Sequence, residues 1–209
     1  MENCVFKTRN FSCPNTLQVI AEKMKKKIII LFLIIPTSLI FGQNISKDSI
    51  IEWKKDNNLS WSEFLGKPND NIIADALTSY KIEVLPSDVV LDENDNILNY
   101  QNLTVKANFY KYHSWYIENT NQLLEHEQLH FDIAELFARK MRMEFEKLKN
   151  DNESNFNIYV DCYNRLWKDC REMQGDYDFD TNHGRENEIN LKWIDKINNE
   201  LSKLNEFEL

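Results

Sequence analysis

Two segments in the first half of the chain alternate between hydrophobic and polar positions with a period of two. One segment places Thr78, Tyr80, Ile82 and Val84 on one face, and residues 103–109 repeat the pattern. This alternation is typical of strands with one buried face. A polar run at residues 92–96 separates the two segments and predicts a turn.

From about residue 119 the hydrophobic spacing becomes that of a helix. Apolar residues recur every three or four positions as far as residue 148, and Asn119 or Thr120 can cap the start. Two further helices are predicted over residues 158–170 and 189–204, and the stretch 174–184 between them is predicted to be a loop. Strands followed by helices indicate an α+β fold, with a small antiparallel sheet followed by one long helix and two shorter ones.

The first 42 residues are predicted to be a leader that does not belong to the fold. Three lysines follow Met24, and an apolar run then leads to Gly42, which is the pattern of a secretory signal peptide. The apolar run is short for a membrane anchor and is interrupted by Pro36. Translation can start at Met24 rather than Met1. We therefore expect an exported protein, periplasmic or secreted, whose domain spans residues 43–209 and keeps no stable membrane anchor.

The charge of the chain argues against nucleic acid as a partner. Its formal net charge is −9, and it becomes more negative once the lysine-rich leader is removed. Such a surface repels nucleic acid and anionic membranes, and it suits cationic peptides.

The long helix carries the clearest chemical signal in the chain. His126 and His130 are four residues apart, so both imidazoles can reach one tetrahedral ion, and Glu127 lies beside them. This is the His-Glu-x-x-His pattern of zinc peptidases, in which the carboxylate contacts a water on the metal and acts as general base and acid. The sequence therefore predicts a Zn²⁺ site on this helix.

A catalytic zinc needs a third protein ligand and an open position. Glu135 lies about 180° around the same helix from His126, so it faces away. His183 is the leading candidate, because the predicted loop can bring it back to the helix. Asp178 and Asp180 are alternatives, and Asp180 can instead orient His183 as an outer partner.

The segment from Leu124 to Glu135, which contains the His-Glu-x-x-His pattern, resembles the signature of domain of unknown function family 922. The stretch from Trp53 to Pro68 and the stretch from Tyr177 to Gly184 are also similar to that family, so that the resemblance covers nearly all of residues 50–205. Members are bacterial proteins described as secreted zinc-dependent proteases. The resemblance implies a zincin-like peptidase domain and supports His183 as the third ligand.

Three functions fit these residues. The leading expectation is an exported zinc peptidase that hydrolyses peptide bonds with a zinc-activated water, with a peptide adding to an exposed edge of the strand at residues 103–109. An amidase acting on cell-wall peptides would use the same site. The third is a zinc-stabilised binding or structural protein of the cell envelope in which Glu127 has no chemical role.

Overall fold

The computed structural model describes residues 5–7, 49–69 and 74–209, and the predicted signal peptide lies outside these residues. The strands are β1 (Val5–Lys7), β2 (Ile50–Glu52), β3 (Ala76–Leu77), β4 (Tyr80–Leu85), β5 (Asp88–Val90), β6 (Thr104–Tyr110) and β7 (Trp115–Tyr116). The helices are α1 (Asn121–Asn150), α2 (Phe156–Thr181) and α3 (Asn187–Lys203), with short 3₁₀ helices at Trp61–Glu63, Tyr100–Asn102, Lys111–His113 and Asn205–Phe207. The predicted α+β fold, with a small antiparallel sheet before three helices, is confirmed.

The central sheet is antiparallel with the strand order β2-β6-β4, and the two strands predicted from the alternating pattern are its β4 and β6. The prediction that β6 offers an exposed edge is wrong. β4 pairs along its length on one side, and β2 pairs with its second half on the other. Next to the end of β2, Arg142 Nη1 donates to the carbonyl oxygen of Val105 at 2.8 Å, which occupies part of the remaining edge.

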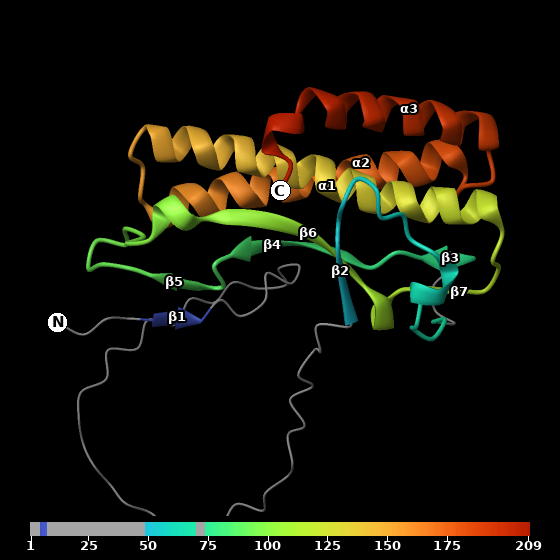
Figure 1. Cartoon of the computed structure of the whole chain (residues 1–209), viewed down its shortest axis with the longest axis horizontal. Helices are drawn as coiled ribbons and strands as arrows, with labels where there is room; N and C mark the ends of the chain where they lie inside the picture. Colours follow the sequence, from blue (N-terminus) through green and yellow to red (C-terminus); the bar gives the residue numbers. More distant parts are fainter. Residues whose placement is uncertain (1–4, 8–48, 70–73) are drawn as a thin grey trace, which may run out of the picture.

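The three helices form a layer over one face of this sheet (Figure 1). α1 packs against β6 and β4, and α2 and α3 pack against α1. The inward residues of β6, Val105, Ala107 and Phe109, are at most 1% exposed. Burial of this apolar face against α1 supplies the main driving force for folding. None of the helices in the described residues is long and apolar enough to cross a membrane.

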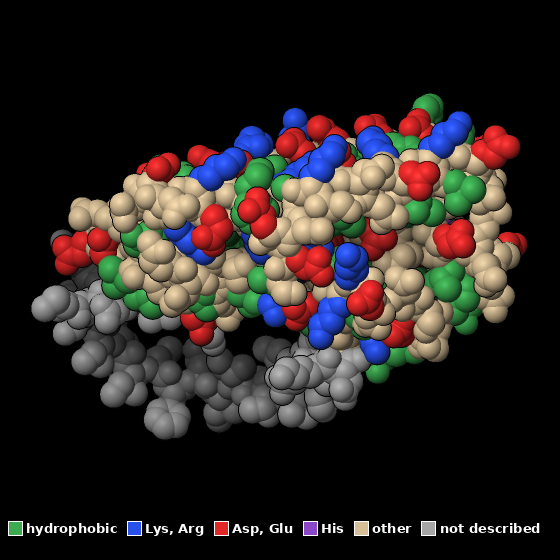
Figure 2. Space-filling model, turned by 45° about the horizontal axis from the view of Figure 1, so that its top comes forward, with side chains coloured by type: hydrophobic (Ala, Val, Ile, Leu, Met, Phe, Trp, Pro, Cys, Tyr) green, Lys and Arg blue, Asp and Glu red, His purple; other side chains and the backbone are tan. Residues whose placement is uncertain are grey.

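The outer surface of the helical layer carries both signs of charge. Lys and Arg side chains lie among Asp and Glu side chains over this face (Figure 2). In the described residues, exposed ion pairs along one helix include Lys203 with Glu200 in α3 and Lys168 with Glu172 in α2. Exposed pairs of this kind contribute little to stability, about 0–1 kcal/mol each.

The predicted loop at residues 174–184 is mostly helix, because α2 continues to Thr181. Gly175 and the nearby aspartates favoured a loop in the sequence. However, Gln174, Tyr177 and Thr181 recur at helical spacing and are 6%, 0% and 0% exposed. Their burial offsets the cost of a glycine inside a helix, about 1 kcal/mol. The loop itself begins at Asn182, whose left-handed φ of 49° ends the helix.

Candidate metal centre

The first turns of α1 hold the two histidines as predicted. The hydroxyl of Thr120 accepts from the backbone N–H of Leu123 and caps the helix. His126 and His130 then project from the same face one turn apart, with their Nε2 atoms 3.2 Å from each other. The two rings are nearly perpendicular, at 83°.

α2 brings a carboxylate to the same point. Asp178 Oδ1 lies 3.2 Å from His126 Nε2 and 3.0 Å from His130 Nε2. These three residues form the group in the described part of the chain whose atoms are placed to hold a metal ion. Ligands about 2.0–2.1 Å from a tetrahedral zinc are separated by about 3.3–3.4 Å, close to the observed distances. Two imidazole nitrogens and a carboxylate oxygen also form a donor set typical of zinc, so the residues fit the ion.

The structure places the other two predicted candidates differently. His183 lies at the outer side of the cluster, with Nδ1 3.6 Å from Asp178 Oδ1 and a side chain that is 55% exposed. Asp180 turns towards α3, where its Oδ2 accepts from Trp193 Nε1 at 3.1 Å. Asp178, an alternative in the sequence, therefore stands where His183 was expected.

Glu127 is buried beside the histidines, with 3% of its surface exposed. Its Oε2 has no hydrogen-bond partner within the described residues. Burial raises the pKa of Glu127, while the charge of His130 and hydrogen bonds from Thr78 act in the opposite direction. The unpaired oxygen of this carboxylate is free to accept a hydrogen bond or a proton.

The pKa values of the three residues in this cluster are all shifted from their ordinary values. Burial lowers the pKa of His126 to about 4, with the hydrogen bond to Asp178 opposing it. Burial also lowers the pKa of His130, but Asp178 and Glu127 outweigh it and raise the value to about 8. Burial would raise the pKa of Asp178, yet its bonds to both histidines hold it well below its usual range. A cation among these groups would replace the proton that His130 holds.

Tyr177 and Gln174 line the site from α2. The Tyr177 ring stacks on His126 with centroids 4.5 Å apart and meets His130 edge to face. It is 0% exposed, and its hydroxyl donates to Asn190 Oδ1 of α3, so it joins α2 to α3 behind the two histidines. Gln174 bonds to His130 through both its amide oxygen and its amide nitrogen.

The loop after α2 packs directly on His126. Gly184 has a φ of 79°, and a Cβ added there would lie 2.8 Å from His126 Cγ. Only glycine combines this backbone conformation with so close an approach. Gln122 Nε2 donates to the Gly184 carbonyl oxygen at 2.7 Å and fixes the loop to the start of α1. The stretch from Tyr177 to Gly184, which resembles the family, thus ends on a glycine that packs against His126.

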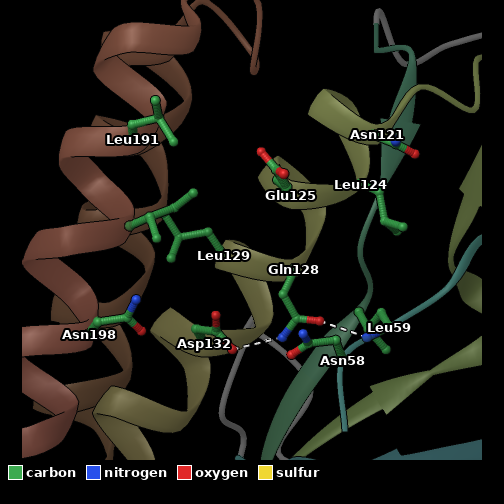
Figure 3. A pocket seen from close by; sticks show the side chains of 11 residues that line it. Asn58, Leu59, Asn121, Leu124, Glu125, Gln128, Leu129, Asp132, Leu191 and Asn198 are labelled. Atoms are coloured by element: carbon green, nitrogen blue, oxygen red, sulfur yellow. Dashed lines mark hydrogen bonds between the residues drawn. The ribbon is translucent and has the colours of Figure 1, made fainter. Parts of the chain in front are cut away.

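The opposite face of α1 is anchored to the segment before the sheet and lines a separate groove of about 620 Å³ against α3 (Figure 3). Gln128 Oε1 accepts from the backbone N–H of Leu59, and its Nε2 donates to Asp132 Oδ1 (Figure 3). Trp53 Nε1 donates to the same oxygen at 2.7 Å. These residues hold α1 in place and lie away from the histidines.

Sequence reasoning missed Gln174, Gly184 and Thr78. A signal for Gln174 was present, because it precedes Asp178 by four residues and shares the spacing of Cys170 and Tyr177. That signal appears only when α2 is continued past residue 174. Thr78 and Gly184 contact α1 from distant segments, and nothing local in the sequence indicates those contacts.

Residues 105–184 match the model of a family described as a bacterial protein of unknown function, DUF922. The match includes His126, Glu127, His130, Asp178 and His183, and it confirms the family resemblance over this range. The stretch from Trp53 to Pro68, which also resembles the family, lies outside the matched residues. No curated protein and no solved structure matches the chain.

Proposed function

Starting from a DUF922 segment that holds the entire ligand cluster, we propose that this protein is a zinc-dependent peptidase. One observation carries the proposal. His126 Nε2, His130 Nε2 and Asp178 Oδ1 converge within 3.2 Å of one another, beside a buried carboxylate, Glu127, that has an unpaired oxygen. Two histidines, an acidic ligand and an adjacent free carboxylate are the parts of a zincin-type hydrolytic site.

His126, His130 and Asp178 would hold the zinc, with Asp178 in the place first assigned to His183. When bound, zinc lowers the pKa of water towards about 7 and polarises a substrate carbonyl. Burial keeps His126 neutral at physiological pH, which leaves its nitrogen lone pair available to a cation. His183, next to Asp178 at the solvent side, is placed to contact substrate or to hydrogen-bond to Asp178.

Glu127 would act as general base and then as general acid. Its unpaired oxygen accepts a proton from the attacking water, and the carboxyl group then delivers that proton to the leaving amine. Burial raises the pKa of Glu127, which makes the carboxylate a stronger base than an exposed glutamate. Thr78, which lies between β3 and β4, donates its hydroxyl to the backbone carbonyl oxygen of Glu127 at 3.1 Å and holds this turn of α1 in place.

The exposure of the cluster favours a catalytic site over a purely structural one. His126 is 3% exposed at its side chain, whereas Asp178 is 33% exposed. The cluster is therefore closed towards the core and open on the Asp178 side. A structural zinc site closes all four positions with protein ligands, while a catalytic site leaves one for water or substrate.

Zinc content and peptide hydrolysis, measured on the same protein preparations, test the proposal. Glu127→Gln should keep zinc and fold but lose about 10²–10⁴-fold in turnover, because an amide cannot accept the proton. Glu125→Gln is the matched control, since Glu125 is an exposed neighbour that lines the groove on the other face of α1, and it should keep full activity.

The outcomes separate the three functions. Activity on cell-wall peptides alone would make the protein an amidase of the cell envelope. Zinc binding without hydrolysis of any peptide by the wild type, and no difference for Glu127→Gln, would leave a zinc-stabilised binding protein. If the wild type contains no zinc, both the zinc peptidase and the zinc-stabilised binding protein are refuted.

We also propose that the protein acts outside the cytoplasm on peptide or protein substrates. The basic and apolar pattern from Met24 to Gly42 supports export. N-terminal sequencing of the protein from the exported fraction should begin near Gln43. An intact Met1 or Met24 on a membrane-embedded product would contradict this.

A further inference from the structure

Gln174 makes two hydrogen bonds to one residue of the cluster. Its Oε1 lies 2.5 Å from His130 Nδ1, and its Nε2 donates to the backbone carbonyl oxygen of His130 at 2.8 Å. Gln174 is 6% exposed, so water does not compete freely for either bond. The amide thus contacts both the ring and the main chain of the same histidine.

The second bond determines the orientation of the amide. A backbone carbonyl oxygen only accepts, so the group of Gln174 that faces it must be the NH₂. The amide oxygen must then face Nδ1 of His130. Because an amide oxygen is also an acceptor only, His130 Nδ1 must carry a proton and donate it. This assignment follows from the chemistry of the two acceptors and not from the position of any hydrogen.

A proton on Nδ1 directs the electron pair of His130 to the cluster. An imidazole that keeps its Nδ1 proton binds a metal through Nε2, and the Nε2 of His130 faces Asp178 and His126. His126 has no equivalent partner, because its Nδ1 is unpaired in the described part of the chain. Its ring is held by stacking on Tyr177 and by contact with Gly184. The two histidines are therefore oriented by different means.

Gln174 and Asp178 are four residues apart on α2, so one helical turn carries both. The helix that supplies the acidic ligand thereby also orients the histidine opposite it. We propose that Gln174 is a positioning residue that keeps the proton on His130 Nδ1 and turns His130 Nε2 towards the ion. The inference rests on the proposed metal site but not on catalysis.

Two measurements test the role of Gln174. The first is ¹⁵N NMR of the metal-free wild type well above pH 8, where His130 is neutral, which should show the remaining proton on Nδ1 and none on Nε2. The second is zinc affinity, from chelator competition, in Gln174→Met, which keeps the length of the side chain but removes both bonds. We expect the affinity to fall about 10–100-fold, the usual effect of removing an outer hydrogen-bond partner. Gln174→Glu keeps the acceptor and should recover most of the affinity.

Gln128→Met is the matched control. Gln128 also makes two hydrogen bonds at 2.7 and 2.8 Å, but on the opposite face of α1, to Leu59 and Asp132 (Figure 3). Its loss should lower stability and leave zinc affinity within a few-fold of the wild type. Equal zinc affinity in Gln174→Met and Gln128→Met would overturn the inference, and so would an unprotonated Nδ1 in the wild type. A wild type that binds no zinc would refute the proposed function, while the NMR result would still decide the role of Gln174.

Discussion

Two regions of α1 bury charged side chains and treat them in opposite ways. In the middle of the helix, Glu135 Oε1 accepts from Arg139 Nε at 2.9 Å and from Arg142 Nη2 at 2.6 Å. The same arginines donate to the carbonyl oxygens of Leu201 and Phe207 near the C-terminus. Two turns earlier, buried polar atoms of the metal centre have no partner in the described residues, namely Glu127 Oε2 and His126 Nδ1.

The difference separates paired side chains, which fix the C-terminal residues to α1, from unpaired atoms that lie beside the candidate metal ligands. Each arginine of the middle cluster reaches several acceptors, and the cluster fixes the C-terminal residues to α1. Even so, burial keeps the pKa of Glu135 above its ordinary value despite Arg142 and Arg139, so desolvation remains expensive. In the candidate metal centre, desolvation of Glu127 is opposed by the charge of His130 and by Thr78, but Glu127 Oε2 and His126 Nδ1 themselves have no hydrogen-bond partner in the described residues.

The largest expected effect comes from breaking the paired region. Glu135→Gln removes the negative charge between two buried arginines and should destabilise the protein by about 3–5 kcal/mol. Urea unfolding of the metal-free protein measures this. Zinc affinity of the fraction that remains folded should stay near that of the wild type, since Glu135 faces away from the histidines. A decrease of less than about 1 kcal/mol in the free energy of unfolding would show that Glu135 and its two arginines contribute little to the stability of the fold.

A smaller effect is expected from protons at the metal centre. His130 has its pKa raised to about 8 and must lose its proton before its Nε2 can bind zinc. Zinc affinity should therefore rise about tenfold per pH unit from pH 6 to pH 8 and level off above. Dissociation constants measured by chelator competition across this range test the slope. An affinity that does not change between pH 6 and pH 8 would contradict the assignment of His130 as a ligand.

The smallest effect on stability is expected for Glu127→Gln, which is compared with the same substitution at Glu135. Glu127→Gln replaces a buried carboxylate that has an unpaired oxygen with a neutral amide. Because a neutral amide is less costly to bury than a charge, the variant should be as stable as the wild type or up to about 1 kcal/mol more stable. Urea unfolding beside Glu135→Gln makes the contrast direct. A destabilisation of more than about 1 kcal/mol would place Glu127 among the residues that hold the fold.

The sequence was sufficient for those parts of the protein that depend on local spacing. The two long strands, the start and cap of α1 and the facing pair His126 and His130 follow from periodicity and capping chemistry. The orientation of Glu135 away from the site follows from helix geometry in the same way.

The identity of the third metal ligand could be found only from the tertiary structure. Asp178 was one of three candidates, because its distance from His126 along the chain is 52 residues and no local pattern spans it. Where α2 ends determines whether His183 or Asp178 reaches the two histidines. A glycine and several aspartates favoured a loop that could carry His183 inward, whereas burial of Tyr177 and Thr181 continues the helix and presents Asp178 instead. Placement of β6 at the centre of the sheet likewise depends on β2, a short strand of three residues.

In the proposed site, zinc is held by His126, His130 and Asp178. The most direct measurement compares the zinc dissociation constants of wild type, Asp178→Asn and His183→Ala under the same conditions. Asp178→Asn removes a charged ligand and should weaken binding by about 100-fold or more, whereas His183→Ala should weaken it by less than about tenfold. The opposite order, with His183→Ala losing zinc and Asp178→Asn retaining it, would contradict the assignment.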